Sequence, residues 1–98
     1  MERGGYTYIL TNTNHTVLYT GVTSNLTNRL HEHRTGKYKN SFTSRYNVKE
    51  LVYYEGFTRI EAAIQREKQI KAGSRQKKLD LIHGFNPEWK DLSDSIVE

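Results

Sequence analysis

The sequence predicts an α+β fold in which a small three-stranded antiparallel sheet is flanked by helices in the order β-β-α-β-α-α. Two observations support this prediction. Three short segments rich in β-branched and aromatic residues are separated by turn-forming residues or by segments whose apolar residues recur at helical spacing. The chain also has only 98 residues, which is enough for one domain with a single core.

The first two strands are predicted at 5–11 and 17–23, where the sequence reads GYTYILT and VLYTGVT. Both segments combine aromatic and β-branched residues, which favour extended structure. The intervening residues 12–15 (NTNH) are turn formers, so the two strands are expected to pair as a hairpin centred near Asn14.

A first helix is expected over 26–35, because Ser24 or Asn25 can cap its start and Gly36 can end it. Such residues supply hydrogen bonds or backbone conformations that helix ends require.

Residues 37–47 are polar and irregular, and we expect one short helical turn near 41–45. The segment 50–57 (ELVYYEGF) then predicts the third strand.

Two further helices complete the predicted order. A capping box formed by Thr58 and Glu61 is expected to start a helix that runs to Ala72. A last helix is expected to begin after Ser74 and to end near His83, where the following residue is glycine. We therefore predict one domain at 1–92 and a short acidic tail at 93–98 that can be partly disordered.

Composition excludes several classes of protein. The chain contains no cysteine, which excludes disulfides, thiolate zinc sites and cysteine nucleophiles. No stretch approaches the roughly 18 apolar residues of a membrane span, and the start lacks the apolar segment of a secretory signal. A cytoplasmic protein is expected.

Positive charge is concentrated in two segments. Residues 29–49 carry six Lys or Arg against one Glu, and so do residues 66–78, whereas the residues from Asp80 onward are acidic. Two basic segments on a small domain suit a polyanion, because Lys and Arg beside phosphates release counterions. Charge alone fits an ordinary solvated surface equally well.

Polar residues occupy positions where the core should be. At 100° per residue, Glu67 falls in the middle of the apolar stripe of its helix, which comprises Ile60, Ala63, Ile64 and Ile70. On the first helix, Arg29 and His33 share the inward face. Burying an unpaired charge costs several kcal/mol. These residues therefore either form an internal Arg29–Glu67 salt bridge or line a functional cleft.

The expected hairpin adds two tyrosines to these candidate site residues, because its turn brings Tyr8 close to Tyr19. Such a cross-strand aromatic pair can serve packing alone. However, Gly21 lies inside the second strand, where a glycine commonly marks the close approach of a ligand or of another backbone. Two phenols, an imidazole, a guanidinium and a carboxylate would together form a phosphate site with room for one metal ion.

These residues resemble the active-site pattern of the GIY-YIG endonuclease superfamily, specifically its short stand-alone bacterial members. The residues at 6–8 stand where the family has Gly-Ile-Tyr, and those at 19–21 stand where it has Tyr-Ile-Gly. Three further segments carry the other family positions. Arg29 and His33 lie in GVTSNLTNRLHEH, Glu67 lies in AAIQREKQIK, and Asn86 lies in FNPEWKDL. The resemblance spans about Tyr6 to Leu92. Tyr6 replaces the first glycine of the family pattern, and threonines replace both central isoleucines. We expect no second DNA-binding domain.

The resemblance implies hydrolysis of phosphodiester bonds with one Mg²⁺ or Mn²⁺ ion, which Glu67 would bind. The implied catalytic residues are Tyr8, Tyr19, Arg29, His33 and Asn86. Tyr19 would activate water if nearby positive charge lowers the pKa of its phenol. Arg29 would stabilise the negative charge that develops on the phosphate, while Tyr8 and His33 would position the water or relay protons.

The expected ligand is nucleic acid, with DNA favoured over RNA and a role in repair or recombination. Residues expected to contact it are Gly21, Lys37, Lys39, Arg45, Lys68 and Lys71. Asn86 would orient its neighbours, although a turn role before Pro87 explains it equally well. A protein partner could direct such a small nuclease to its target.

Two alternatives remain open at this stage. The domain could bind nucleic acid on the same fold without cutting it. It could also be a protein-interaction domain in which Tyr53, Tyr54 and Trp89 form an exposed aromatic patch.

Overall fold

The sheet consists of β1 (Gly5–Thr11), β2 (Leu18–Thr23) and β3 (Glu50–Phe57), and the computed structural model describes residues 4–36 and 41–96 of the chain. β1 is the central strand and pairs antiparallel with β2 on one side and β3 on the other. The predicted α+β class and the predicted strands are confirmed.

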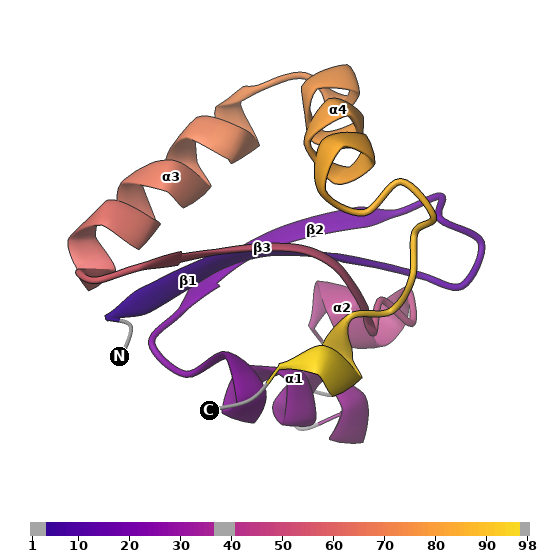
Figure 1. Cartoon of the computed structure of the whole chain (residues 1–98). Helices are drawn as coiled ribbons and strands as arrows, with labels where there is room; N and C mark the ends of the chain where they lie inside the picture. The colour runs from indigo at the N-terminus through magenta and orange to yellow at the C-terminus, as the bar shows by residue number, and fades with distance from the viewer. Residues whose placement is uncertain (1–3, 37–40, 97–98) are drawn as a thin grey trace.

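Helices cover the two faces of the sheet (Figure 1). α1 (Leu26–Thr35) and the short α2 (Phe42–Arg45) lie on one face, which is below the sheet in the figure. α3 (Ile60–Ala72) and α4 (Arg75–Phe85) lie on the other face. A 3₁₀ helix, Ser93–Ser95, lies beside α1.

Each face of the sheet has its own core, because successive side chains of a strand point to opposite faces. On the α1 face, the buried apolar residues are Tyr8, Leu10, Leu26, Leu30, Val48 and Leu51. On the α3 face, they are Ile9, Val52, Tyr53, Ile70 and Ile82. The side chains of β1 thus contribute to both cores, which fixes the position of Tyr8 between β2 and α1.

Three helix ends have the capping residues that the sequence predicted. The Asn25 side chain accepts a hydrogen bond from the Asn28 amide at 3.0 Å and caps α1. Gly36 ends α1 in the left-handed conformation, with φ of 70°. The Ser74 hydroxyl accepts from the Lys77 amide at 3.2 Å and caps α4.

Two predicted helix ends were wrong. The N-cap residue of α3 is Arg59, which makes no side-chain capping bond. Glu61 pairs with the Arg59 guanidinium at 3.4 Å instead of forming a capping box with Thr58. α4 continues through Gly84 to Phe85. Gly84 does not adopt a positive φ, so it does not provide the left-handed turn that would end the helix earlier.

The C-terminal segment is attached to the α1 face of the sheet. The Asp91 carboxylate accepts a hydrogen bond from the Leu51 amide at 3.1 Å and pairs with the Arg34 guanidinium at 3.3 Å. The Leu92 amide donates to the Leu51 carbonyl at 2.8 Å, and Ile96 packs against the core of this face. Residues 93–96 of the expected tail therefore take part in the fold.

The aromatic patch considered above does not form. Tyr53 is only 7% exposed and belongs to the core of the α3 face. Tyr54 and Trp89 are half-buried and pack against opposite faces of the sheet. Among the helices of the described residues, none is long and apolar enough to cross a membrane.

Candidate active site

Tyr8 and Gly21 are directly opposite in the pairing of β1 with β2. Tyr8 is fully buried, and its ring lies 6.4 Å from that of Tyr19. A Cβ atom on Gly21 would lie 2.5 Å from the Tyr8 hydroxyl oxygen. The close approach expected at Gly21 is therefore made by the Tyr8 phenol. The expected contact of Gly21 with substrate stays a prediction.

His33 connects Tyr8 to α2. It is 8% exposed, and its Nε2 atom lies 3.2 Å from the Tyr8 hydroxyl oxygen. Its Nδ1 atom lies 2.9 Å from the Thr43 hydroxyl oxygen, which in turn lies 3.2 Å from that of Ser41. Sequence analysis did not identify Thr43, because nothing in its local pattern indicates a partner on another helix.

Burial determines the protonation states of Tyr8 and His33. Burial and the nearby Arg29 charge lower the pKa of His33, so its imidazole is neutral at neutral pH. Burial, reinforced by Tyr19, raises the pKa of Tyr8 well above its ordinary value, so its phenol keeps its proton. We therefore assign the Tyr8 hydroxyl as donor to His33 Nε2, and His33 Nδ1–H as donor to Thr43.

Arg29 projects from the same helix and pairs with Glu32, with 3.3 Å between Nε and the carboxylate. The Glu32 side chain is 12% exposed and close enough to influence the pKa values of both Tyr8 and His33. Glu32 is a second residue that sequence analysis missed, although its spacing of three from Arg29 is a signal for such a pair.

The internal Arg29–Glu67 salt bridge does not form. Glu67 lies on α3, on the opposite face of the sheet from α1 (Figure 1). It pairs instead with Lys71, whose Nζ lies 2.8 Å from the carboxylate. This hydrogen bond is the main factor that raises the pKa of Lys71, and Tyr19 contributes to the same shift. The Glu67–Lys71 pair therefore lies within electrostatic reach of Tyr19 at the edge strand β2.

Glu67 is the residue best suited to bind a metal ion. Its side chain is 13% exposed, and no group of three or more His, Asp or Glu residues is found in the described ranges that could form a complete protein cage. Thr20 follows Tyr19 and thus points to the α3 side of β2, where its hydroxyl is buried without a hydrogen-bond partner among the described residues. A single carboxylate is compatible with Mg²⁺, which usually keeps several waters and uses substrate phosphates as ligands.

A cavity of about 290 Å³ opens between β2, α1 and α2, on the face of the sheet that carries His33. Tyr19, Arg29, His33 and Thr43 contribute to its lining. Phe42 forms another part of the wall, where it stacks on Tyr19 with 6.2 Å between ring centroids. A phosphate group that enters this cavity would meet the Arg29 guanidinium and the Tyr19 phenol together.

Asn86 is not part of this group. It follows α4 and is buried, and its side-chain amide donates to the carbonyls of Val52 at 3.2 Å and Lys90 at 2.8 Å. Its side-chain oxygen accepts from the Lys90 amide at 3.1 Å. These bonds to backbone support the turn interpretation, and the catalytic assignment of Asn86 stays a prediction.

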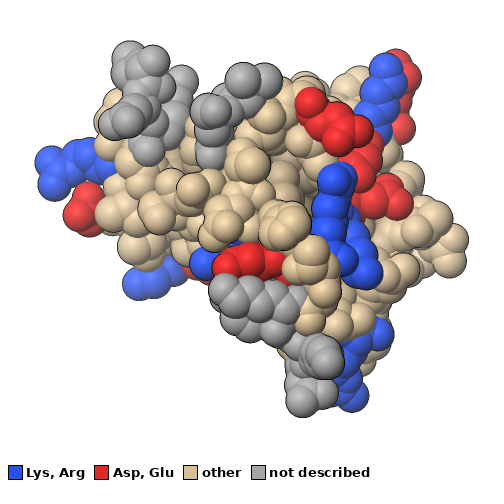
Figure 2. Space-filling view, turned by 90° about the horizontal axis from the view of Figure 1, so that it is seen from below, with Lys and Arg blue, Asp and Glu red and all other residues tan. Residues whose placement is uncertain are grey.

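The expected substrate-binding cations are dispersed. Arg45 is exposed on α2, and Lys68 and Lys71 are exposed on α3, whereas Lys37 and Lys39 lie outside the described residues. Figure 2 shows the face that carries α1, where Lys and Arg stand apart and are interspersed with Asp and Glu. The basic segments of the sequence therefore do not merge into one continuous basic surface in this view.

Comparison with known proteins agrees with this geometry. Residues 4–80 match the family described as the GIY-YIG catalytic domain, and the chain belongs to that family. Within it, the chain is similar to proteins named UPF0213. The one from Syntrophus aciditrophicus is 43% identical over 85% of this chain and 93% of the relative, and one from Natronomonas pharaonis is 43% identical over 84% and 94%.

The fold has a solved counterpart as well. The solution NMR structure of a UPF0213 protein from Bacillus halodurans matches with a TM-score of 0.57 and 26% identity, and the alignment covers 96% of this chain and 98% of that one. The resemblance on which the catalytic residues were assigned is therefore confirmed at the level of family and fold.

Proposed function

We propose that this protein is a metal-dependent endonuclease that hydrolyses phosphodiester bonds in nucleic acid, with DNA favoured over RNA. The observation that carries the proposal is the convergence of Tyr8, Tyr19, Arg29 and His33 on one side of β2, with the Glu67 carboxylate on the other. The GIY-YIG catalytic-domain family supports an enzymatic role for this arrangement.

Glu67 would bind one Mg²⁺ or Mn²⁺ ion, and its pairing with Lys71 would give way to the ion. When bound, such an ion stabilises negative charge on phosphate oxygens and helps to orient the substrate. Lys71 would remain nearby as one of the residues expected to contact the nucleic acid.

The remaining residues would act directly on the phosphate and the water. Arg29, oriented by Glu32, would stabilise the charge that develops as water attacks phosphorus and the bond to the leaving oxygen breaks. Tyr19 would accept the proton of that water, which requires its phenolate form. Tyr8 stays protonated. Its hydrogen bond to His33 would keep both side chains in a fixed position beneath the site.

The competing function is binding of nucleic acid without cleavage. The short Glu67–Lys71 contact favours it to the extent that the carboxylate is already neutralised. In either case we propose a cytoplasmic role in DNA repair or recombination, with a protein partner selecting the target.

The test is to incubate the protein with supercoiled, single-stranded and branched DNA and with RNA, in Mg²⁺ and in Mn²⁺. Glu67→Gln should lower cleavage by about 100-fold or more, because the metal would lose its protein ligand. Glu61→Gln is the matched control, since Glu61 lies on the same helix and is 70% exposed. Binding that is equal in all variants, without cleavage by any of them, would establish the competing function instead.

A further inference from the structure

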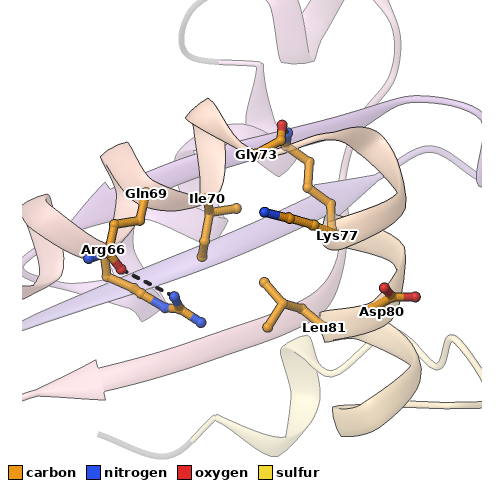
Figure 3. A pocket seen from close by; sticks show the side chains of 8 residues that line it. Arg66, Gln69, Ile70, Gly73, Lys77, Asp80 and Leu81 are labelled. Atoms are coloured by element: carbon orange, nitrogen blue, oxygen red, sulfur yellow. Dashed lines mark hydrogen bonds between the residues drawn. The ribbon is translucent and has the colours of Figure 1, made fainter.

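A groove between α3 and α4 lies on the face of the sheet opposite to the Tyr8–His33 pair (Figure 3). Its volume is about 350 Å³, within the range of sites that hold small ligands. Ile70 and Leu81 form its apolar part, and Arg66 and Lys77 provide positive charge. No residue proposed for cleavage contributes to its lining.

The guanidinium of Arg66 is held in place by neighbouring side chains. Its Nε donates to the Glu55 carboxylate at 3.1 Å, and Nη1 donates to the Gln69 side-chain oxygen at 3.3 Å. The buried Tyr53 hydroxyl fixes the same carboxylate at 2.7 Å. Figure 3 shows the guanidinium extending along the groove toward Leu81. A planar group fixed in this way presents its remaining N–H donors to a ligand at little entropic cost.

Lys77 faces Arg66 across the groove. Its side chain passes over Gly73, where a Cβ atom would lie 3.5 Å from Lys77 Cδ, and its ammonium points toward Ile70 (Figure 3). None of the hydrogen bonds or ion pairs of the described residues engages that ammonium. The neighbouring Lys78 differs, because its ammonium donates to the Gly73 carbonyl at 2.9 Å.

The acidic residue beside the groove does not neutralise Lys77. Asp80 points away from the groove in Figure 3, and its carboxylate accepts a hydrogen bond from the Gln76 side chain at 2.9 Å. The groove therefore combines the Lys77 ammonium and the Arg66 guanidinium, whose charge Glu55 partly balances, with the apolar side chains of Ile70 and Leu81. This combination suits an anion attached to an apolar body.

We infer that the α3–α4 groove binds a nucleotide through its phosphate. Arg66 and Lys77 contact the phosphate oxygens, and Ile70 and Leu81 contact the base or the sugar. A free mononucleotide and one unit of a strand offer this same chemistry. The inference concerns a site separate from the proposed nuclease site and requires no cleavage.

The test uses ¹⁵N-labelled protein in EDTA, so that cleavage plays no part. Deoxyadenosine monophosphate should shift the amide signals of Gly73, Lys77 and Leu81, whereas deoxyadenosine, which lacks the phosphate, should not. A 5′-phosphorylated tetranucleotide forms the third arm. Tighter binding of the tetranucleotide than of the mononucleotide identifies a strand as the source, and the reverse order identifies a free nucleotide.

Variants locate the binding. Lys77→Gln and Arg66→Gln should each weaken binding by about tenfold, the usual scale for loss of one charge-assisted hydrogen bond. Lys90→Gln and Arg59→Gln, which make the same charge changes at exposed positions elsewhere, should change it less than about twofold. Three results would each overturn the inference. They are no saturable shift at about 10 mM nucleotide, shifts confined to the surroundings of Tyr19, and equal weakening by Lys77→Gln and Lys90→Gln.

Discussion

The Tyr8 phenol occupies the space that a side chain on Gly21 would need, since a Cβ atom there would come within 2.5 Å of the phenol oxygen. The two residues are register partners in adjacent strands. The strand pairing therefore positions the phenol, and through it the hydrogen bond to His33.

Gly21→Ala is expected to lower the free energy of unfolding by about 1–3 kcal/mol, because the buried Tyr8 ring must move to admit the methyl group. Urea denaturation measures this change. Gly84→Ala is the control, because a Cβ atom there meets nothing within 4 Å. It should leave stability unchanged or raise it by up to about 1 kcal/mol, as expected for glycine replaced by alanine within a helix. Equal stability of the two variants would contradict the packing role of Gly21.

Thr43→Val is expected to destabilise the protein by about 1–3 kcal/mol, because it leaves the buried Nδ1–H of His33 without its acceptor. The two side chains have nearly the same shape, so little packing is lost. Thermal unfolding measures the effect, and Thr27→Val, at an exposed position of α1, should change stability by less than about 0.5 kcal/mol. If the two substitutions cost the same, Thr43 does not support the imidazole.

Stability is expected to fall as pH decreases from 7.5 to 5.5, because burial and Arg29 lower the pKa of His33 in the folded protein. The unfolded chain binds a proton at His33 near the ordinary pKa of about 6.5, whereas the folded protein resists protonation until lower pH. The stabilising contribution is thus complete above the unfolded pKa and is lost as pH falls through the folded one.

Urea denaturation at several pH values checks this dependence. The contribution of one such group cannot exceed about 1.4 kcal/mol per pH unit. His33→Gln should flatten the profile, whereas His31→Gln, at an exposed position of the same helix, should leave it as in the unmodified protein. Superimposable profiles for the two variants would show that His33 is not the group responsible.

Asn86→Ala is expected to reduce stability by about 1–3 kcal/mol, through loss of its bonds to the backbone of Val52 and Lys90. If the protein cleaves DNA, the rate per folded molecule should change by less than about twofold at a temperature where the variant remains folded. Asn28→Ala, at an exposed position of α1, serves as the stability control. A loss of cleavage without a loss of stability would support a catalytic role for Asn86.

Local sequence signals predicted the elements because their causes are local. Runs of β-branched and aromatic residues, a capping Asn25 and the left-handed Gly36 each act within a few positions of themselves. The errors arose where a local pattern fits more than one arrangement. Thr58 fits a capping box, yet Glu61 pairs with Arg59, and Ile64 fits the apolar stripe of α3 but remains exposed.

The site was predictable only in part. Helical spacing correctly predicted that Arg29 and His33 lie together, and the expected hairpin correctly predicted that Tyr8 lies close to Tyr19. Partners from other elements carry no periodic signal. Thr43 reaches His33 from α2, and no pattern in its own segment indicates that contact. The sequence also did not show which face of the sheet α3 covers, so it left open the Arg29–Glu67 pair, although the i,i+4 spacing of Glu67 and Lys71 is itself a signal for the pair that forms.

Asp91 also bears on where this fold ends. The match to the catalytic-domain family stops at residue 80, yet the Asp91 carboxylate joins α1 to β3 through Arg34 and the Leu51 amide. A chain shortened to the matched boundary would leave the Leu51 amide without its carboxylate and would uncover the core beneath Ile96. The family match therefore ends before the residues that contact α1 and cover the core on its face of the sheet.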